Sequence, residues 1–369
     1  MRGSINLKKI FLKGYLIKNL GDDLFIKIIS ERYPQVVFDA YSLKKYNKNI
    51  FKQKNLNLYF FENFITKVIN MLFFKMGIKK SITREMKNDY LATVIIGGSL
   101  FIETEKFNSS KYLNYNYKFI RPYYILGSNF GPYFTQEYLE VNKENIIKKA
   151  EDVCFRDNSS YILFNDLNNV RIASDVVFSM DLSHIKITEE DKVVISVIDC
   201  CRKVNPKYKI GYENKIIELI KYFIKKDYNI TLMSFCKSEG DEEVIERIIK
   251  KFNNQQKNKI KKHFYRGDIN EAINELACSK IIIGTRFHAN ILGLKLNKTI
   301  IPIAYSDKTI NVLKDMNFKG KIFDIRKLED FNITKITDQD LSYKIEIKEQ
   351  VESANQHFYK LDKLLKETD

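Results

Sequence analysis

The sequence predicts an α/β protein built from two Rossmann-like domains. Its 369 residues are too many for one typical domain, and 44% of them are hydrophobic, which is ordinary for a globular protein with a real core. Short apolar runs alternate with helical patterns along most of the chain. Several of these runs end in glycine or in charged residues, as strands of an open parallel sheet do beside a ligand crevice.

The first half of the chain begins as a β-α-β unit. A strand is predicted at residues 9–12, and a polar turn follows over residues 14–21. A helix over residues 22–33 ends at Pro34, and the next strand covers residues 36–39. Further buried strands are predicted at Thr93–Ile96, Tyr123–Leu126 and Val153–Phe155. Asp22 and Asp23 suit a helix N-terminus, where carboxylates meet the positive end of the dipole.

The second half repeats the pattern after a polar boundary near residues 180–190. Strands are predicted at residues 192–197, 229–235, 264–265, 280–283 and 299–303. Helices are predicted at residues 215–225, 241–252, 268–278 and 287–294, with Asp268 capping the third. We therefore expect an N-terminal domain over residues 1–182, a C-terminal domain over residues 183–342 and a C-terminal helix over residues 343–369.

Charge and apolar stretches bear on where the protein works. The net charge of +16 suits an anionic substrate, an anionic membrane surface or nucleic acid. The apolar segment Leu58–Met76 is interrupted by charged and amide side chains, so we expect a helix packed on the core or resting on a membrane, not a spanning one. The five cysteines fit neither a disulfide framework nor a zinc site, and the N-terminus has no signal-peptide pattern. We expect a cytoplasmic protein with buried free thiols, either soluble or peripheral at the inner membrane face.

The strongest local signal is the segment from Ile281 to Ala289. A buried strand leads through Gly284 into a helix start that carries Arg286 and His288. Free N–H groups at a helix start favour an anion, an arginine fork suits phosphate or carboxylate, and histidine adds a titratable donor. The bland alternative is a helix start with solvated side chains.

Weaker signals lie in the first half. Arg156 directly follows a strand, and Asn19, Gly21 and Asp22 lie in the loop between the first strand and helix, which is a usual ligand position. Gly98 and Ser99 also follow a strand. No GxGxxG motif, P-loop, HExxH motif or Cys/His cluster is present, so the sequence predicts no nucleotide fingerprint and no metal site.

Taken together, these motifs resemble the polysaccharide pyruvyl transferase family. The resemblance rests on Gly14, Asn19, Gly21, Asp22, Gly97-Gly98, Arg156-Asp157 with Ser159 or Ser160, Asp175-Val176-Val177-Phe178, Thr285-Arg286-Phe287-His288-Ala289 and Tyr305-Ser306-Asp307-Lys308, and it runs from about residue 9 to about residue 315. The sequence departs from the family pattern at Ser99, Val176 and Phe287, where the family usually has glycine, proline and leucine.

The resemblance implies a GT-B-like pair of Rossmann-like domains with the active site in the interdomain cleft. It implies phosphoenolpyruvate as co-substrate, no further cofactor, and a sugar or lipid-linked oligosaccharide as acceptor, which receives a pyruvate ketal. The acceptor and Arg156 would belong to the N-terminal domain, and the donor phosphate to the C-terminal domain. Arg156, Arg286, Phe287 and His288 match the donor-binding positions.

We expect His288 to act as general acid and Asp22 to activate a sugar hydroxyl. Weaker substrate contacts are expected from Asn19, Gly21, Gly98, Ser99 and Lys308. Two alternatives stay open at this point. One is a GT-B glycosyltransferase that uses a nucleotide sugar, because the fold alone does not separate the two reactions. The other is a non-enzymatic nucleic-acid-binding protein, although the sequence shows no nucleic-acid motif, and we expect no such partner.

Overall fold

The computed structural model describes residues 8–42, 53–60, 90–110, 112 and 121–368. The chain divides into two compact units. The first holds Met1–Leu16, Phe25–Ala173 and Asn355–Asp369, and the second holds Ile17–Leu24 and Ser174–Ala354. The division differs from the sequence-based one because the start of the first helix belongs to the second unit and the end of the last helical segment belongs to the first.

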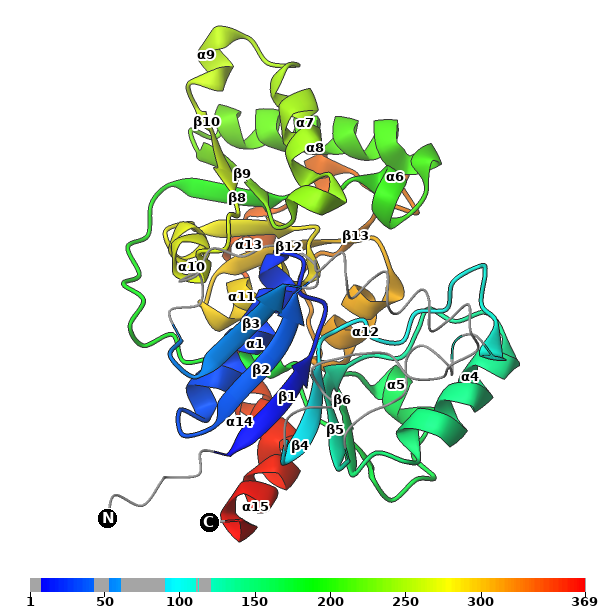
Figure 1. The fold of residues 1–369 in the computed structure, drawn as a ribbon. Coiled ribbons are helices and arrows are strands. Elements are labelled where there is room, and N and C mark those ends of the chain that lie inside the picture. Colours follow the sequence, from blue (N-terminus) through cyan, green and yellow to red (C-terminus); the bar gives the residue numbers. More distant parts are fainter. Residues whose placement is uncertain (1–7, 43–52, 61–89, 111, 113–120, 369) are drawn as a thin grey trace. The chain divides into compact units, whose positions relative to one another are not determined.

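The first unit is a parallel sheet of seven strands with flanking helices (Figure 1). Its strands are β1 (Lys9–Lys13), β2 (Val37–Ser42), β3 (Leu56–Phe60), β4 (Ala92–Ile96), β5 (Tyr123–Ser128), β6 (Asp152–Phe155) and β7 (Val170–Ile172). Its helices are α1 (Leu20–Arg32, which starts in the second unit), α4 (Gln136–Asn142), α5 (Asn158–Ile162) and α15 (Tyr359–Glu367), with single turns at Lys143–Ile147 and Gln356–Phe358. The strand order is β3-β2-β1-β4-β5-β6-β7, so it reverses between β1 and β4.

The C-terminal helix packs on the first unit through polar and aromatic contacts. Arg32 at the end of α1 pairs with Asp362 at 2.9 Å, and its guanidinium lies 4.5 Å from the Phe358 ring. The Tyr33 hydroxyl also donates to Asp362, at 2.5 Å. The C-terminal helix therefore belongs to the first unit. The sequence analysis predicted it as a separate element because its partners in the first unit lie 330 and 329 residues earlier in the sequence.

The second unit is a parallel sheet of six strands, ordered β10-β9-β8-β11-β12-β13. Its strands are β8 (Lys192–Ser196), β9 (Asn229–Ser234), β10 (Ile260–Phe264), β11 (Ile281–Gly284), β12 (Thr299–Ala304) and β13 (Phe323–Asp324). Its helices are α6 (Cys200–Lys203), α7 (Lys209–Lys225), α8 (Asp241–Ile249), α9 (Asn254–Lys257), α10 (Ile269–Ala277), α11 (Phe287–Lys295), α12 (Asp307–Asp315), α13 (Asp338–Ser342) and α14 (Lys348–Asn355). Single turns lie at Val176–Ser179, Pro206–Tyr208, Lys237–Glu239 and Ile333–Lys335.

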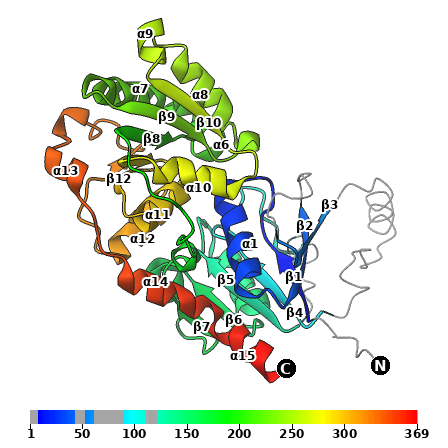
Figure 2. The ribbon, with the colours of Figure 1, turned by 90° about the vertical axis from the view of Figure 1, so that its left-hand side faces the viewer.

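The centre of the second unit explains why its strands were easy to predict. Strands β8, β11 and β12 are buried along their whole length, as strands covered on both faces are. Helices α7 and α8 cover one face, and α10 and α11 cover the other (Figures 1 and 2). The strand order reverses between β8 and β11, and the carboxyl ends of strands at such a reversal are the usual ligand position in this class of fold.

Some predicted elements were wrong. The helix expected from Leu58 is strand β3 up to Phe60, and residues 61–76 of that prediction lie outside the described residues. The short strand expected at residues 264–265 is β10 at Ile260–Phe264, an edge strand. Its exposed lysines interrupt the apolar pattern, so the prediction covered only its end. The cap was confirmed, because Asp268 accepts a hydrogen bond from the Glu271 N–H at 3.0 Å.

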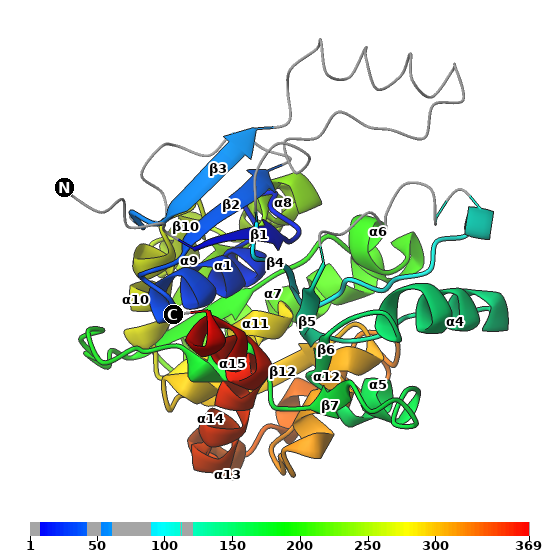
Figure 3. The same cartoon turned by 60° about the horizontal axis from the view of Figure 1, so that its bottom comes forward.

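The cysteines and the helices bear on the remaining expectations. Cys154, Cys200 and Cys236 are buried as predicted, whereas Cys278 is half-buried and Cys201, in the short helix α6, is exposed. Within the described ranges, no helix is both long enough and apolar enough to cross a membrane. Figure 3 shows α4 and α5 beside strands β5 to β7 of the first unit.

Candidate functional site

The junction between β11 and α11 carries the Arg286–His288 segment. The Ser196 side chain at the end of β8 accepts a hydrogen bond from the Arg286 N–H at 3.1 Å. Asn290 in α11 donates back to the Gly284 carbonyl at 2.9 Å, and a Cβ added at Gly284 would lie 2.1 Å from the Asn290 side chain. Glycine is therefore required at this turn, and the start of α11 is fixed against the carboxyl ends of β8 and β11.

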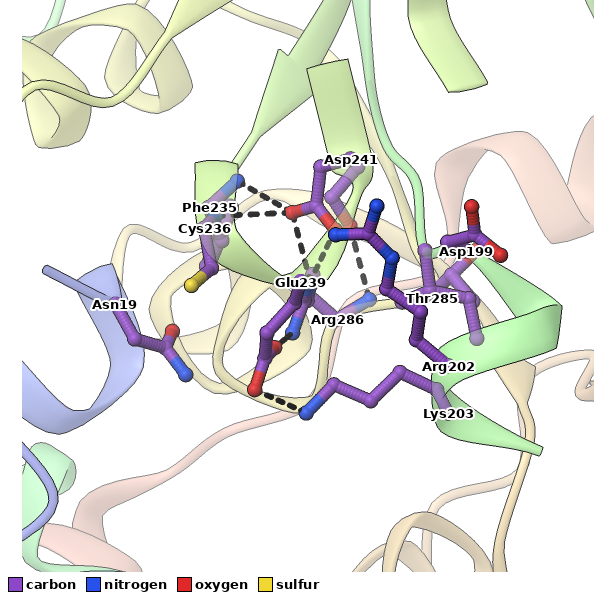
Figure 4. A network of polar contacts seen from close by, with 12 residues as sticks. Asn19, Asp199, Arg202, Lys203, Phe235, Cys236, Glu239, Asp241, Thr285 and Arg286 are labelled. Carbon is purple, nitrogen blue, oxygen red and sulfur yellow. Dashed lines mark hydrogen bonds and ion pairs between the residues drawn. The ribbon is translucent and has the colours of Figure 1, made fainter. Parts of the chain in front are cut away.

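The side chain of Arg286 is buried between two carboxylates. Its Nε donates to Asp241 Oδ2 at 3.1 Å, its Nη2 pairs with Asp241 Oδ1, and its Nη1 pairs with Glu239. Glu239 also pairs with Lys203 of α6, so that it lies between the two cations (Figure 4). Burial alone would lower the pKa of Arg286, but the charges of Asp241 and Glu239 outweigh it and raise that pKa above its ordinary value.

Asp241 extends this network to the backbone of a neighbouring strand end. Its Oδ2 accepts hydrogen bonds from the N–H groups of Phe235 and Cys236, at 2.9 and 3.0 Å, just after β9. The Arg286 guanidinium therefore ties α11 to β9 and to the first residue of α8. Sequence analysis predicted Arg286 as an anion ligand, and the structure gives it two internal anions.

His288, the second residue of α11, lies beside a third carboxylate. Its Nε2 is 3.9 Å from Oδ2 of Asp175, which is fully buried and caps the turn that follows it through the Val177 N–H. The exposed fraction of the His288 side chain is 11%. An imidazole held within 4 Å of a buried carboxylate is an arrangement suited to proton transfer.

The start of α1 lies against the other ring nitrogen of His288. A Cβ added at Gly21 would be 2.3 Å from His288 Nδ1, so only glycine allows this approach. Asn19 accepts a hydrogen bond from the Gly21 N–H at 3.2 Å, and Asp22 follows in the same turn, half-buried. The predicted loop residues Asn19, Gly21 and Asp22 are thus grouped with His288 in the second unit.

Two contacts explain why this short segment belongs to the second unit. The Leu20 N–H donates to the Phe235 carbonyl at 3.0 Å. The buried carboxylate of Asp23 accepts a hydrogen bond from the Tyr265 hydroxyl at 2.7 Å. Phe235 and Tyr265 follow the ends of β9 and β10, so the first turn of α1 is fastened to the carboxyl edge of the second sheet.

The junction between β12 and α12 contributes Lys308. Its Nζ lies 5.0 Å from the ring centre of Tyr305 and 5.9 Å from that of Phe287. Burial alone would raise the pKa of the Tyr305 phenol, but the charges of Lys308, Lys203 and Arg286 outweigh it and hold that pKa below its ordinary value. The predicted residues Phe287 and Lys308 are therefore in contact, and cations surround Tyr305.

The first unit holds the remaining predicted residues around Arg156. This arginine is buried, and its Nη2 donates to Asn129 Oδ1 at 2.6 Å. A Cβ added at Gly98 would lie 2.6 Å from Arg156 Nη1. The Ser99 hydroxyl donates to the same Asn129 Oδ1 at 3.4 Å. The predicted residues Arg156, Gly98 and Ser99 are therefore neighbours in the first unit. Gly98 lies just beyond β4, at the strand-order reversal of the first sheet.

Sequence analysis missed several partners of these residues. They are Asn129 beside Arg156, Asp175 beside His288, and Glu239 and Asp241 beside Arg286. Asp175 carried a signal, since it opens the Asp175–Phe178 motif. The two partners of Arg286 lie 47 and 45 residues before it in the sequence, and no local pattern marks them.

Comparisons with known proteins agree with the architecture. The family profile of the polysaccharide pyruvyl transferases matches residues 19–307. Comparison with curated proteins gave no significant match.

Among solved structures, the chain is similar to the UDP-GlcNAc 2-epimerase of Methanocaldococcus jannaschii, solved with UDP-GlcNAc and UDP. The TM-score is 0.56 at 11% identity, over 96% of this chain and 99% of that one. It is also similar to Anabaena HepE, solved with UDP and glucose, with a TM-score of 0.52 at 11% identity over 98% and 99% of the two chains. At such identities the similarity concerns the fold alone, and it confirms the predicted pair of GT-B-like Rossmann domains.

Proposed function

Because this chain belongs to the polysaccharide pyruvyl transferase family, we propose that it transfers the pyruvyl group of phosphoenolpyruvate to hydroxyls of a sugar. The sugar would be part of a surface polysaccharide or of its precursor, including a lipid-linked oligosaccharide, and the product would be a pyruvate ketal. Phosphoenolpyruvate is a co-substrate in this proposal, and no cofactor is required.

The observation that carries the proposal is the environment of His288. The imidazole lies between the Asp175 carboxylate and the close backbone of Gly21, at the first turn of α11. A histidine fixed in this way is suited to giving a proton to a substrate bound at the carboxyl edge of the sheet.

The reaction balances with the groups proposed. C3 of the enol gains one proton, and C2 becomes electron-poor. Two sugar hydroxyls form bonds to C2, the bond from C2 to the phosphate oxygen breaks, and inorganic phosphate leaves. One of the two hydroxyl protons accounts for the proton gained at C3, and the other leaves with phosphate.

Each predicted residue has a role in this scheme. His288 gives the proton, and Asp22 activates a hydroxyl. Arg156 binds the donor, and the Arg286 N–H groups not used by Asp241 and Glu239 add to the positive field. The smaller contacts are assigned to Asn19, Gly21, Gly98, Ser99, Phe287 and Lys308.

Thermal melting tests the choice of donor directly. Phosphoenolpyruvate should raise the melting temperature of the full chain, and UDP- and CMP-sugars should not. The opposite pattern would favour the glycosyltransferase alternative. Binding to DNA that persists at physiological salt would favour the nucleic-acid alternative.

Phosphate release tests the role of His288. With phosphoenolpyruvate and a panel of sugar glycosides or cell-surface polysaccharide as acceptor, His288→Ala should release phosphate about 10²–10⁴-fold more slowly. His184→Ala is the matched control, since His184 is exposed. Equal rates in wild type and folded His288→Ala would remove His288 from the mechanism.

A further inference from the structure

The first turn of α12 holds two buried hydroxyls without a hydrogen-bond partner among the described residues. Ser306 occupies the N-cap with an extended backbone (φ −155°, ψ 162°), where a serine hydroxyl normally accepts a helix N–H, yet it makes no such bond. Thr309 lies in the same turn and is fully buried, and its hydroxyl also lacks a partner among the described residues. Buried polar atoms without partners are rare in folded proteins, so a ligand or water is expected to complete them.

Lys308 lies between Ser306 and Thr309 in the sequence, and no carboxylate of the described residues pairs with it. Among the described residues no carboxylate lies within ion-pair distance of Lys308, whose Nζ is placed over the rings of Tyr305 and Phe287. The neighbouring Asp307 is committed elsewhere, because it pairs with Arg326 at 2.8 Å. Lys308 therefore keeps its charge for an external anion.

The surroundings of the junction add positive field. The N-terminal N–H groups of a helix lack partners within the helix, and its dipole is positive at that end. Arg286 and Lys203 lie close enough to Tyr305 to lower its pKa together with Lys308. Since Arg286 and Lys203 are already paired with carboxylates, Lys308 is the cation of this group best placed to contact a ligand.

We propose that the β12–α12 junction is a phosphate-binding site, in which Lys308 Nζ, the Ser306 hydroxyl and the first N–H groups of α12 contact the phosphoryl group. In this site Arg286 is a positioning residue that fixes the neighbouring helix start, and Lys308 is the phosphate ligand. The identification of this phosphoryl group as that of phosphoenolpyruvate rests on the proposed function, but the site itself does not.

Inorganic phosphate is the first probe, titrated calorimetrically into the full-length protein. Wild type should bind it saturably. Lys308→Met, which keeps the chain length over the two rings, should weaken binding at least tenfold, and Lys308→Arg should restore most of it. Ser306→Ala should weaken binding several-fold. Lys314→Met is the matched control, because Lys314 is an exposed lysine on the same helix, and it should bind phosphate as wild type does.

The second probe is phosphoenolpyruvate, whose KM should rise about tenfold in Lys308→Met with a smaller change in kcat. The site is overturned if wild type shows no saturable phosphate binding, or if Lys308→Met and Ser306→Ala, both folded by their melting temperatures, bind phosphate as wild type does. If phosphate binding depends on Lys308 while phosphoenolpyruvate neither binds nor competes, the site stands and the proposed function fails.

Discussion

Two neighbouring strand-to-helix junctions of the second sheet hold their cations in opposite ways. At β11–α11, Arg286 is buried and paired with the carboxylates of Asp241 and Glu239. At β12–α12, Lys308 is placed over two aromatic rings, beside hydroxyls that have no partner in the described structure. The strands are adjacent and parallel, so backbone geometry does not explain the difference. When the fold supplies its anion, a basic residue at a helix start stabilises the structure, and we call such a residue a tie. When the fold supplies no anion, the residue is free to contact a ligand.

The largest expected effect on stability is that of removing the Arg286 tie. Arg286→Ala would leave the buried Asp241 and Glu239 without their main counter-charge. Breaking a buried ion pair from one side typically costs about 3–5 kcal/mol. We expect the melting temperature of the full chain to fall by about 10 °C, and phosphate release to fall with it.

The control for this experiment is Arg202→Ala in α6. Arg202 is half-exposed and lies 4.0 Å from Glu243, so its removal should change stability little. Adding Asp241→Asn and Glu239→Gln to Arg286→Ala should recover part of the lost stability. If Arg286→Ala alone melts as wild type does, then Arg286 is not a tie, and the contrast between the junctions disappears.

The next effect concerns the fit of Gly21 against His288. Gly21→Ala introduces a Cβ 2.3 Å from Nδ1, so the ring or the first turn of α1 must move. Misplacing a reacting group by about 1 Å commonly costs about 10²-fold in rate. We expect a loss of that size in phosphate release from phosphoenolpyruvate.

A matched glycine separates this effect from crowding in general. Gly211→Ala in α7 introduces a Cβ 2.4 Å from the end of the flexible Leu328 side chain, away from His288. It should keep near-normal activity. Similar losses in both variants would mean that Gly21 matters only for packing.

The sequence predicted well whatever local patterns encode. Continuous apolar runs such as Val193–Ile195 and Ile281–Ile283 are typical of central strands of a covered sheet, and both were found as such. The edge strand β10 was predicted only at its carboxyl end, because Lys261 and Lys262 break its apolar run. The return of α15 to the first unit escaped because it depends on Asp362, far in sequence from its partners Arg32 and Tyr33.

The candidate site shows the same limit. Arg156, Arg286, His288 and Lys308 follow strands, so their place at a sheet edge could be predicted from periodicity and motif. The ion pairs and hydrogen bonds of these side chains could not be predicted, because they depend on residues that are distant in the sequence and that only the fold brings close. Glu239 and Asp241 turn Arg286 inward, and Asp175 lies beside His288 from a separate turn.

A smaller effect should appear in the pH dependence of stability. Burial raises the pKa of Glu239, but the charges of Arg286 and Lys203 outweigh it and hold that pKa below its ordinary value. A carboxylate with a depressed pKa in the folded state stabilises fully above its unfolded value of about 4.3, and loses that contribution as the pH falls through the folded value. Glu239→Gln should therefore be less stable than wild type at neutral pH by about 1–3 kcal/mol, and the difference should shrink below about pH 4.

Urea unfolding at several pH values between 7 and 3.5 measures this difference. Glu246→Gln is the control, because Glu246 forms an exposed pair with Lys262 at 2.7 Å and should show a small difference at all pH values. A constant gap between wild type and Glu239→Gln down to pH 3.5 would show that Glu239 does not titrate as part of the tie.

The smallest effect tests to which of the two kinds Arg156 belongs. Arg156 donates to the neutral amide of Asn129 and lies flat against Gly98. If it is a donor ligand, as Lys308 is proposed to be, Arg156→Ala should raise the KM for phosphoenolpyruvate about tenfold and change kcat less, because a positioning charge acts on ground-state binding. Gly98→Ala should act in the same direction by displacing the guanidinium, and Arg121→Ala, which removes an exposed arginine of the same unit, should have no effect. Steady-state phosphate release and melting temperature, measured on the same samples, decide the matter. An unchanged KM together with a fall in melting temperature as large as that of Arg286→Ala would place Arg156 among the ties, and Lys308 would then be the cation that contacts the donor.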